Sequence, residues 1–188
     1  MRLGGPAIFG IAVGIASAAG AQPVPPGEEG ELLAFLPPRH GEHACFARAY
    51  DSAHLAAHPD QTVTAMEFRI AYFRWESDDL YPLGQRNYYF ALRAKRRGEA
   101  SELTAMGECT PLGEGIGCGV DCDGGGIRVS RDVDGTVLVD LGEDGRIRMT
   151  PGCGDEETGA IDLTSGKDDR WFRLDPVPGA QCQGYDDW

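Results

Sequence analysis

All four histidines of the chain lie in one short stretch, between His40 and His58. His54 and His58 are four residues apart, so on a helix the two imidazoles would share one face and could hold a divalent metal ion. Pro59 follows directly and would end such a helix early, and no metalloprotease motif surrounds the pair. The alternative is that both are ordinary histidines at the edge of a loop. A metal site at His54 and His58 is therefore a hypothesis, and we expect no other cofactor.

Six cysteines form a second group of reactive side chains, and their number is even. In an exported chain such a set indicates disulfides, with metal ligation as the alternative. No two cysteines have the two-residue spacing of a redox motif, which argues against thiol–disulfide exchange. Six cysteines allow 15 connectivities. The hairpin around Leu112-Gly113 should bring Cys109 opposite or diagonal to Cys118, and a closed barrel would favour Cys45–Cys182, which ties the two ends of the meander. The remaining pair is Cys122–Cys153.

Acidic residues are abundant, but they form no recognisable catalytic arrangement. The formal net charge is −13 at pH 7, which disfavours nucleic acid and anionic membrane surfaces as partners. Asp121 and Asp123 precede three glycines, and Asp132 and Asp134 lack the glutamate that would complete a calcium loop, so we interpret all four as turn residues. The sequence has no nucleophile elbow, phosphate loop or dinucleotide fingerprint. We therefore predict a protein that is not an enzyme.

The first 21 residues have the features of a secretory signal peptide. Arg2 supplies the positive charge, the stretch 8–19 is apolar, and Ala19-Gly20-Ala21 provides small residues for cleavage. A membrane anchor is the alternative, but the segment is short and no basic residues follow it. We expect an exported protein with no membrane span after cleavage. A periplasmic location is our first prediction, and full secretion is the alternative.

Alternation of apolar and polar residues predicts that most of the chain forms β-strands, because side chains alternate between the two faces of a strand. The segment 62–75 should be a long strand with Met66, Phe68, Ile70 and Tyr72 facing inward. The segment 44–50 could be a first strand or a helical turn, and 52–58 a loop or a short helix. Further strands are expected at 87–97, 101–109, 116–122, 127–131, 137–141, 147–149, 161–164 and 171–174.

Turn residues between these segments agree with the side-chain pattern. In a hairpin, the number of loop residues decides whether the odd-numbered or the even-numbered residues of the next strand face inward. Gly98-Glu99 predicts a two-residue type II′ turn, and residues 123–126 a four-residue loop. Residues 133–135 and 143–145 predict three-residue loops with a left-handed glycine in the last position. A final hairpin should join 161–164 to 171–174. The predicted pairs are Ala94 with Leu103, Leu92 with Ala105, Cys122 with Ile127, Val129 with Val139, and Leu141 with Ile147.

Consecutive hairpins without a long crossover predict an all-β fold: an antiparallel meander of seven to nine strands, closed or nearly closed into a barrel, with a β-sandwich as the alternative. This layout is similar to a calycin-type or lipocalin-type barrel in architecture only, and it implies none of that family's binding residues here. We divide the chain into a signal peptide (1–21), a Pro/Gly-rich leader (22–40), one disulfide-containing β domain (41–183) and an acidic tail (184–188).

The expected inner face suggests a binding module for a small apolar or amphipathic ligand. Small residues lie beside aromatic side chains with polar tips, and the predicted contacts inside the barrel are Tyr72, Tyr88, Phe90, Ala105 and Arg131. A fully packed core is the alternative use of such a face. The second functional hypothesis is an envelope interaction or inhibitor-like protein that binds a partner protein through its surface. Its candidate residues form an outer aromatic patch: Phe73, Trp75, Tyr81 and Tyr89.

Overall fold

The computed structural model describes residues 24–79, 81–82, 84–121, 123–150 and 159–182. The proposed signal peptide (1–21), the acidic tail (184–188) and the predicted pair Cys122–Cys153 lie outside these residues. Within them, no helix has the length and apolar character needed to cross a membrane.

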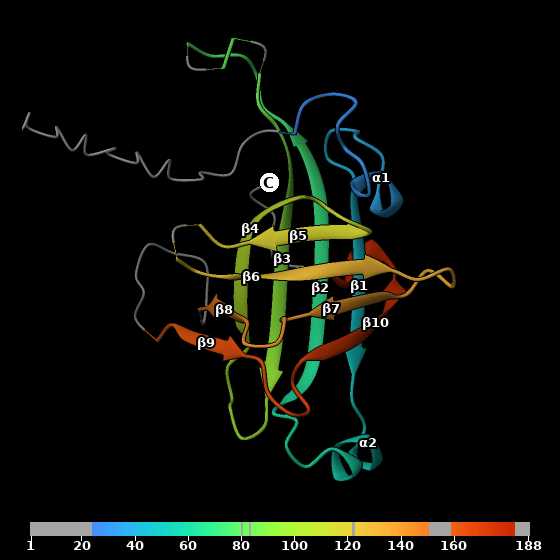
Figure 1. Ribbon diagram of the computed structural model, residues 1–188, viewed down its shortest axis with the longest axis vertical. Helices are drawn as coiled ribbons and strands as arrows, with labels where there is room; N and C mark the ends of the chain where they lie inside the picture. Colours follow the sequence, from blue (N-terminus) through green and yellow to red (C-terminus); the bar gives the residue numbers. More distant parts are fainter. Residues whose placement is uncertain (1–23, 80, 83, 122, 151–158, 183–188) are drawn as a thin grey trace, which may run out of the picture.

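The fold is an antiparallel β-barrel, as the alternation of side chains predicts. Eight strands close in the order β1-β10-β7-β6-β5-β4-β3-β2, and β8 pairs with β9 in a separate two-stranded sheet. Figure 1 shows the long strands β2 and β3 along the molecule, with β5, β6 and β7 crossing in front of them. The strands are β1 (His43–Ala49), β2 (Val63–Arg74), β3 (Arg86–Arg96), β4 (Leu103–Leu112), β5 (Gly115–Gly119), β6 (Gly126–Arg131), β7 (Val137–Asp140), β8 (Arg146–Met149), β9 (Ile161–Thr164) and β10 (Trp171–Val177).

Short helical segments flank the barrel. In Figure 1, helix α1 (Leu32–Phe35) lies beside the upper part of β1, and helix α2 (Ser52–Ala57) lies at the lower end of the molecule. A 3₁₀ turn, η1 (Gly179–Gln181), follows β10. The segment 44–50, which the sequence left open, forms strand β1, and 52–58 forms α2 and its C-terminal cap.

Several predicted strand pairs are confirmed. Ala94 pairs with Leu103, and Leu92 with Ala105, between β3 and β4. Val129 pairs with Val139 between β6 and β7, and Gly135 is left-handed (φ 86°) at the last position of their three-residue loop.

Two of the predicted turns differ from the structure. The hydrogen bond from the Glu99 N–H to the Arg96 carbonyl (3.3 Å) centres the β3–β4 turn on Arg97 and Gly98, one residue earlier than expected. Strand β5 ends at Gly119, so Ile127 pairs with Cys118 and not with Cys122. A Cβ on Gly126 would lie 2.5 Å from the Cys118 carbonyl oxygen, so this close pairing requires glycine.

The predicted pair of Leu141 with Ile147 is wrong, because the chain leaves the barrel after β7. Gly142, not Gly145, adopts the left-handed conformation (φ 81°), and the Leu141 N–H donates to the Arg170 carbonyl. Ile147 then pairs with Leu163, which also excludes the predicted hairpin of 161–164 with 171–174.

The interior is a packed apolar core. Phe68, Ile70, Tyr88, Phe90 and Leu92 have no accessible surface. A side chain beside a space wide enough for water keeps some accessible area, so these residues border no such space. A register shift between Val63 and Ala65 turns Val63 into the core in place of Thr64, whose hydroxyl donates to the Lys95 carbonyl.

Residues from outside the barrel strands complete this core. Val24, Leu32, Phe35 and Leu36, within the segment that we predicted as a leader, are buried against it. Ile147, Met149 and Leu163 of the β8–β9 hairpin join the same cluster. The barrel is therefore closed by two additional segments, one from before β1 and one from after β7.

Two predicted disulfides are confirmed, Cys109–Cys118 and Cys45–Cys182. The first links paired residues of neighbouring strands, nine positions apart in sequence. The second spans 137 positions and joins β1 to the segment after β10, next to the place where the barrel closes. The loop-closure entropy that a disulfide removes from the unfolded chain grows with loop length. In the chain-entropy model, Cys45–Cys182 should therefore stabilise the fold by about 5 kcal/mol and Cys109–Cys118 by about 2.5 kcal/mol.

Candidate functional site

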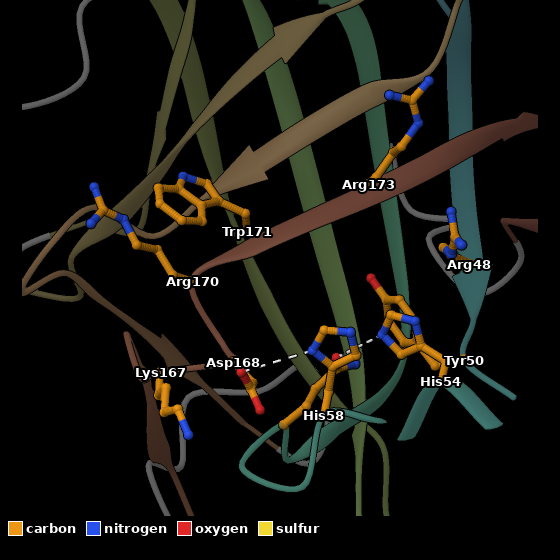
Figure 2. Close-up of a pocket in the computed structure, with 10 residues that line it drawn as sticks. Arg48, Tyr50, His54, His58, Lys167, Asp168, Arg170, Trp171 and Arg173 are labelled. Carbon is orange, nitrogen blue, oxygen red and sulfur yellow. Dashed lines mark hydrogen bonds and ion pairs between the residues drawn. The ribbon is translucent and has the colours of Figure 1, made fainter. Parts of the chain in front are cut away.

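A groove of about 340 Å³ opens on the outside of the barrel, near α2 (Figure 2). Its position follows from the way the barrel closes. Strand β10 pairs with β1 only from Asp175 to Val177, whereas its first half, Trp171–Leu174, pairs with β7. The end of β1 and the start of β10 are thus not joined to each other, and the groove lies between them.

One wall of the groove is a column of stacked rings. Tyr50 stacks on His54 (centroids 4.7 Å apart) and His54 on His58 (4.4 Å), while the Arg48 guanidinium lies 5.5 Å from the centre of the Tyr50 ring. Helix α2 positions the histidines because the Asp51 carboxylate caps it by accepting from the His54 N–H (2.7 Å). The Arg97 guanidinium holds its other end by donating to the Leu55 and His58 carbonyls.

The opposite wall comes from β10 and the loop before it. Trp171 is 56% exposed and faces outward, as its buried neighbour Phe172 requires on a strand. The Arg170 guanidinium lies 4.2 Å from the Trp171 ring centre, a cation–π contact. Figure 2 shows Arg170 and Trp171 across the groove from the ring column, with Asp168 between Lys167 and His58.

Asp169 joins the two walls beneath the groove. Its buried carboxylate accepts from the Thr62 N–H (2.7 Å), the Thr62 hydroxyl and the Val63 N–H (3.3 Å). Gln61, also buried, accepts a hydrogen bond from His54 Nε2 through its Oε1 (3.0 Å) and donates to the Val63 carbonyl (2.7 Å). These contacts bind the α2–β2 loop to the β9–β10 loop, more than a hundred residues later in the chain.

The groove is lined by more positive than negative side chains. Four of its lining residues, Arg48, Lys167, Arg170 and Arg173, are permanently cationic, against the single carboxylate of Asp168. Aspartates beyond the lining pair with these cations: Asp60 with Lys167 (2.8 Å), Asp140 with Arg170 (3.6 Å), Asp175 with Arg48 (4.0 Å), and Asp132 and Asp134 with Arg173. Exposed pairs of this kind contribute little stability, about 0–1 kcal/mol, so an incoming anion can compete with them.

The lining residues offer poor groups for nucleophilic catalysis. Burial raises the pKa of the Tyr50 hydroxyl to about 12, with the Arg48 charge acting in the opposite direction, so Tyr50 stays protonated at neutral pH. His58 Nδ1 lies 3.8 Å from Asp168, beyond the reach of a hydrogen bond. The arrangement is suited to holding a ligand by stacking and charge.

The structure brings the predicted pair His54 and His58 together on one face of α2. Their rings are stacked, at 27° to each other, so the nitrogen lone pairs lie in nearly parallel planes and do not converge on one point. Among the described residues, the grouping of three potential metal ligands is Cys45, Glu67 and Cys182, in which the two sulfurs form a disulfide. A metal at His54 and His58 stays a prediction.

Of the five residues predicted to contact a ligand inside the barrel, four lie in the core and one lies on the surface. Tyr72, Tyr88, Phe90 and Ala105 belong to the packed core. Arg131 is exposed at the end of β6, where its guanidinium lies 6.0 Å from the Phe46 ring centre and donates to the Ala34 carbonyl. Burial raises the pKa of the Tyr88 hydroxyl, and this hydroxyl has no hydrogen-bond partner among the described residues.

The predicted outer aromatic patch is present at the far end of β2 and β3. Phe73 stacks on Trp75 (5.7 Å) and meets Tyr89 edge-on (6.5 Å), and the Trp75 indole N–H donates to the Tyr89 hydroxyl (2.9 Å). His40 packs edge-on against Phe73 (5.0 Å). We call His40, Phe73, Trp75 and Tyr89 the hairpin aromatic patch; Tyr81 lies exposed in the loop beyond it.

Most of the groove was not predicted from the sequence. The histidines were identified, but as metal ligands, and Trp171 was assigned to a hairpin that does not form. The available signal was Trp171, which lies between Arg170 and Arg173 in sequence. A large aromatic side chain on the outer face of a strand often marks a binding surface.

The chain was compared with protein-family models, with curated proteins and with solved structures, and no match was found in any of the three.

The buried carboxylate of Asp169 should be essential to the shape of the groove. Replacing it, Asp169→Ala, leaves the Thr62 and Val63 donors buried without an acceptor, so we expect a loss of about 3 kcal/mol in the free energy of unfolding, measured in urea by circular dichroism. Asp175→Ala is the matched control, because this exposed carboxylate makes one loose ion pair and should cost less than about 1 kcal/mol. Equal losses for the two variants would contradict the assignment.

Proposed function

We propose that this protein is a non-enzymatic binding module that holds a small anionic ligand with a flat ring in the groove between β1 and β10. The observation that supports this most directly is the gathering of four permanent cations and two histidines around one groove, in a chain whose net charge is −13. The aspartates that pair with these cations lie outside the lining, so the surface that faces the groove is mainly positive, which favours an anion as the ligand.

The two walls suggest how the ligand would be held. Trp171, whose side chain is largely exposed, presents a flat apolar surface on which a ring can stack. Arg48 is the cation with the loosest partner, 4.0 Å from Asp175, so its guanidinium has donors to spare for a carboxylate, sulfate or phosphate group. The proposed ligand is therefore amphipathic, as the sequence suggested, but bound outside the barrel.

Export from the cytoplasm is part of the same proposal. The two disulfides are compatible with an oxidising compartment, since such bonds are rare in reducing ones. The signal-like residues 1–21 point the same way, and a periplasmic location remains our first expectation, with secretion as the alternative.

Anilinonaphthalene sulfonate, a fluorescent flat ring bearing one sulfonate, is a suitable probe of the groove. We expect Arg48→Gln and Trp171→Ala each to weaken its binding about tenfold, since a charge-assisted contact or a stacking contact contributes about 1–2 kcal/mol. Raising the salt concentration should weaken binding to the unmodified protein and have less effect on Arg48→Gln, because exposed charges are screened. Fluorescence titration measures all of these affinities.

Arg39→Gln is the matched control for this experiment, because Arg39 is an exposed arginine paired with Glu42 and takes no part in the groove. It should leave the affinity unchanged. Probe binding that is insensitive to salt and to both groove variants would rule out the groove as the site.

A second candidate function is protein recognition through the hairpin aromatic patch, as an envelope interaction or inhibitor-like protein would require. Trp75 and Tyr81 remain 45% and 40% exposed although they lie at the end of a well-packed hairpin, and aromatic residues are enriched at protein interfaces. The Trp75–Tyr89 hydrogen bond fixes the indole and lowers the entropy lost when a partner binds.

Site-directed photo-crosslinking in the native host tests this alternative. A photoreactive residue at position 81 should give one discrete adduct that disappears when Trp75→Ala is added, because the patch would lose its central ring. The same residue at position 112, where Leu112 is similarly exposed away from the patch, serves as the control. Identical adducts from both positions would mean that the patch has no partner of its own.

A further inference from the structure

The segment before β1 closes the barrel at the end opposite α2, and we call residues 24–36 the N-terminal plug (Figure 1). Leu32, Phe35 and Leu36 are buried in the barrel core, and Phe35 meets Phe46 edge-on at 6.4 Å. The plug therefore fills an apolar space that the strands leave open, in the way an apolar ligand fills the mouth of a small barrel.

Among the residues that the structure describes, burial is the main interaction that holds the plug in place. Helix α1 has four residues, and the side chain of Glu31 at its start makes no capping hydrogen bond. A helix this short has no stability of its own in water. The contact from the Arg131 guanidinium to the Ala34 carbonyl is exposed, and Pro37-Pro38 separate α1 from β1 in sequence. The plug is therefore a segment whose place depends on its apolar side chains.

The Tyr88 hydroxyl is a polar group that the plugged barrel does not satisfy. Tyr88 is fully buried, its hydroxyl has no hydrogen-bond partner among the described residues, and its ring meets Tyr72 edge-on at 5.0 Å. Tyr88 belongs to the same buried cluster as Leu32, Phe35 and Leu36 of the plug, so the hydroxyl and the plug share one core. An unpaired buried hydroxyl costs free energy, and a ligand that pairs with it recovers that cost.

We propose that the barrel mouth beneath the N-terminal plug is a second ligand site, for a neutral apolar molecule with one hydrogen-bonding group. The ligand displaces Leu32 and Phe35 and pairs with the Tyr88 hydroxyl. A neutral ligand is required because the seat is apolar apart from the hydroxyls of Tyr72 and Tyr88, and burying an unpaired charge there would be costly. This site is independent of the groove between β1 and β10.

The plug acts as an intramolecular competitor. A ligand that binds only the open mouth has its affinity reduced by the fraction of molecules in which the mouth is open. Weakening the plug raises that fraction, and with it the apparent affinity, without changing any contact made by the ligand. The plugged state described here is then the resting state of the site.

Phenylnaphthylamine, the uncharged counterpart of the groove probe, tests the proposal. It is apolar and has one N–H that can donate to the Tyr88 hydroxyl oxygen. Leu32→Ala shrinks a side chain with no exposed surface and should raise the affinity for this probe at least about tenfold. Leu33→Ala is the matched control on the same helix, because Leu33 is 52% exposed, and it should leave the affinity unchanged.

Tyr88→Phe provides the second arm of the experiment. Added to Leu32→Ala, it should remove most of the gain in affinity, since the hydrogen bond is lost while the apolar space is kept. Alone, it should leave the urea midpoint equal or higher, because it removes an unpaired hydroxyl. If Leu32→Ala does not unfold cooperatively, Phe35→Leu replaces it as the milder change at the plug.

Two results would overturn the proposal. One is equal phenylnaphthylamine affinity in the unmodified protein, the plug variants and Leu33→Ala. The other is an equal gain for the sulfonated probe in a plug variant, which would indicate a loosened core and not a neutral-ligand site. Because the groove arginine Arg48 takes no part in this site, failure here leaves the proposed function standing, and loss of groove binding leaves this site untouched.

Discussion

The structure depends on closing one sheet around one apolar face. Strands β1 and β10 come from the two ends of the described domain, and they meet over three residue pairs, from Cys45 with Val177 to Ala47 with Asp175. One partner in this short ladder is Pro176, which has no N–H to donate. This junction of β1 and β10, the seam of the barrel, therefore has the weakest hydrogen bonding in the wall. The Cys45–Cys182 disulfide links β1 to the segment after β10 next to it. Without closure, the aromatic interior around Phe46, Phe68 and Phe172 would face water.

The candidate groove is a consequence of that seam. Because pairing stops at Ala47 and Asp175, the start of β10 and the end of β1 diverge, and polar side chains fill the opening. The buried Asp169 carboxylate ties the loops below the opening with hydrogen bonds that no strand pairing supplies. The gap keeps its shape because the buried side chains of Asp169 and Gln61 are hydrogen-bonded to the backbone around it.

Both ends of the barrel are completed by segments that are not part of it. The β8–β9 hairpin contributes Ile147, Met149 and Leu163, and residues 24–36 contribute Leu32 and Phe35. A small barrel with eight strands has just enough interior for side chains, so apolar segments placed over its openings become part of one core. The difference between the two is that the hairpin is held by strand pairing, whereas the N-terminal plug is held mainly by burial.

Side-chain alternation predicted the barrel well because each strand has one buried face, and a shift by one residue would expose all of it. That constraint gave the pairs of Ala94 with Leu103 and of Val129 with Val139, and the disulfide Cys109–Cys118. The disulfide Cys45–Cys182 followed from the expectation that the barrel closes. Side-chain alternation could not show which glycine after β7 adopts the left-handed conformation. Gly142 and Gly145 are equally suited to a turn, and in the structure it is Gly142.

The groove was beyond the reach of local patterns for a different reason. Its walls, around His54 and Trp171, are brought together by hydrogen bonds between residues 107 positions apart, such as Thr62 with Asp169. Nothing in either segment alone indicates the other. The histidine spacing was visible in the sequence, but the stacking of Tyr50 on His54 that makes these rings part of a groove wall was not.

Native-state amide hydrogen exchange is the most direct test of barrel closure. If the seam is part of one cooperative wall, the paired amides of β1 and β10 should exchange only through global unfolding, with the same free energy as those of β2 and β3. Exchange at β1 and β10 with a free energy several kcal/mol lower, in protein whose disulfides are intact, would mean that the sheet is open and would contradict the account.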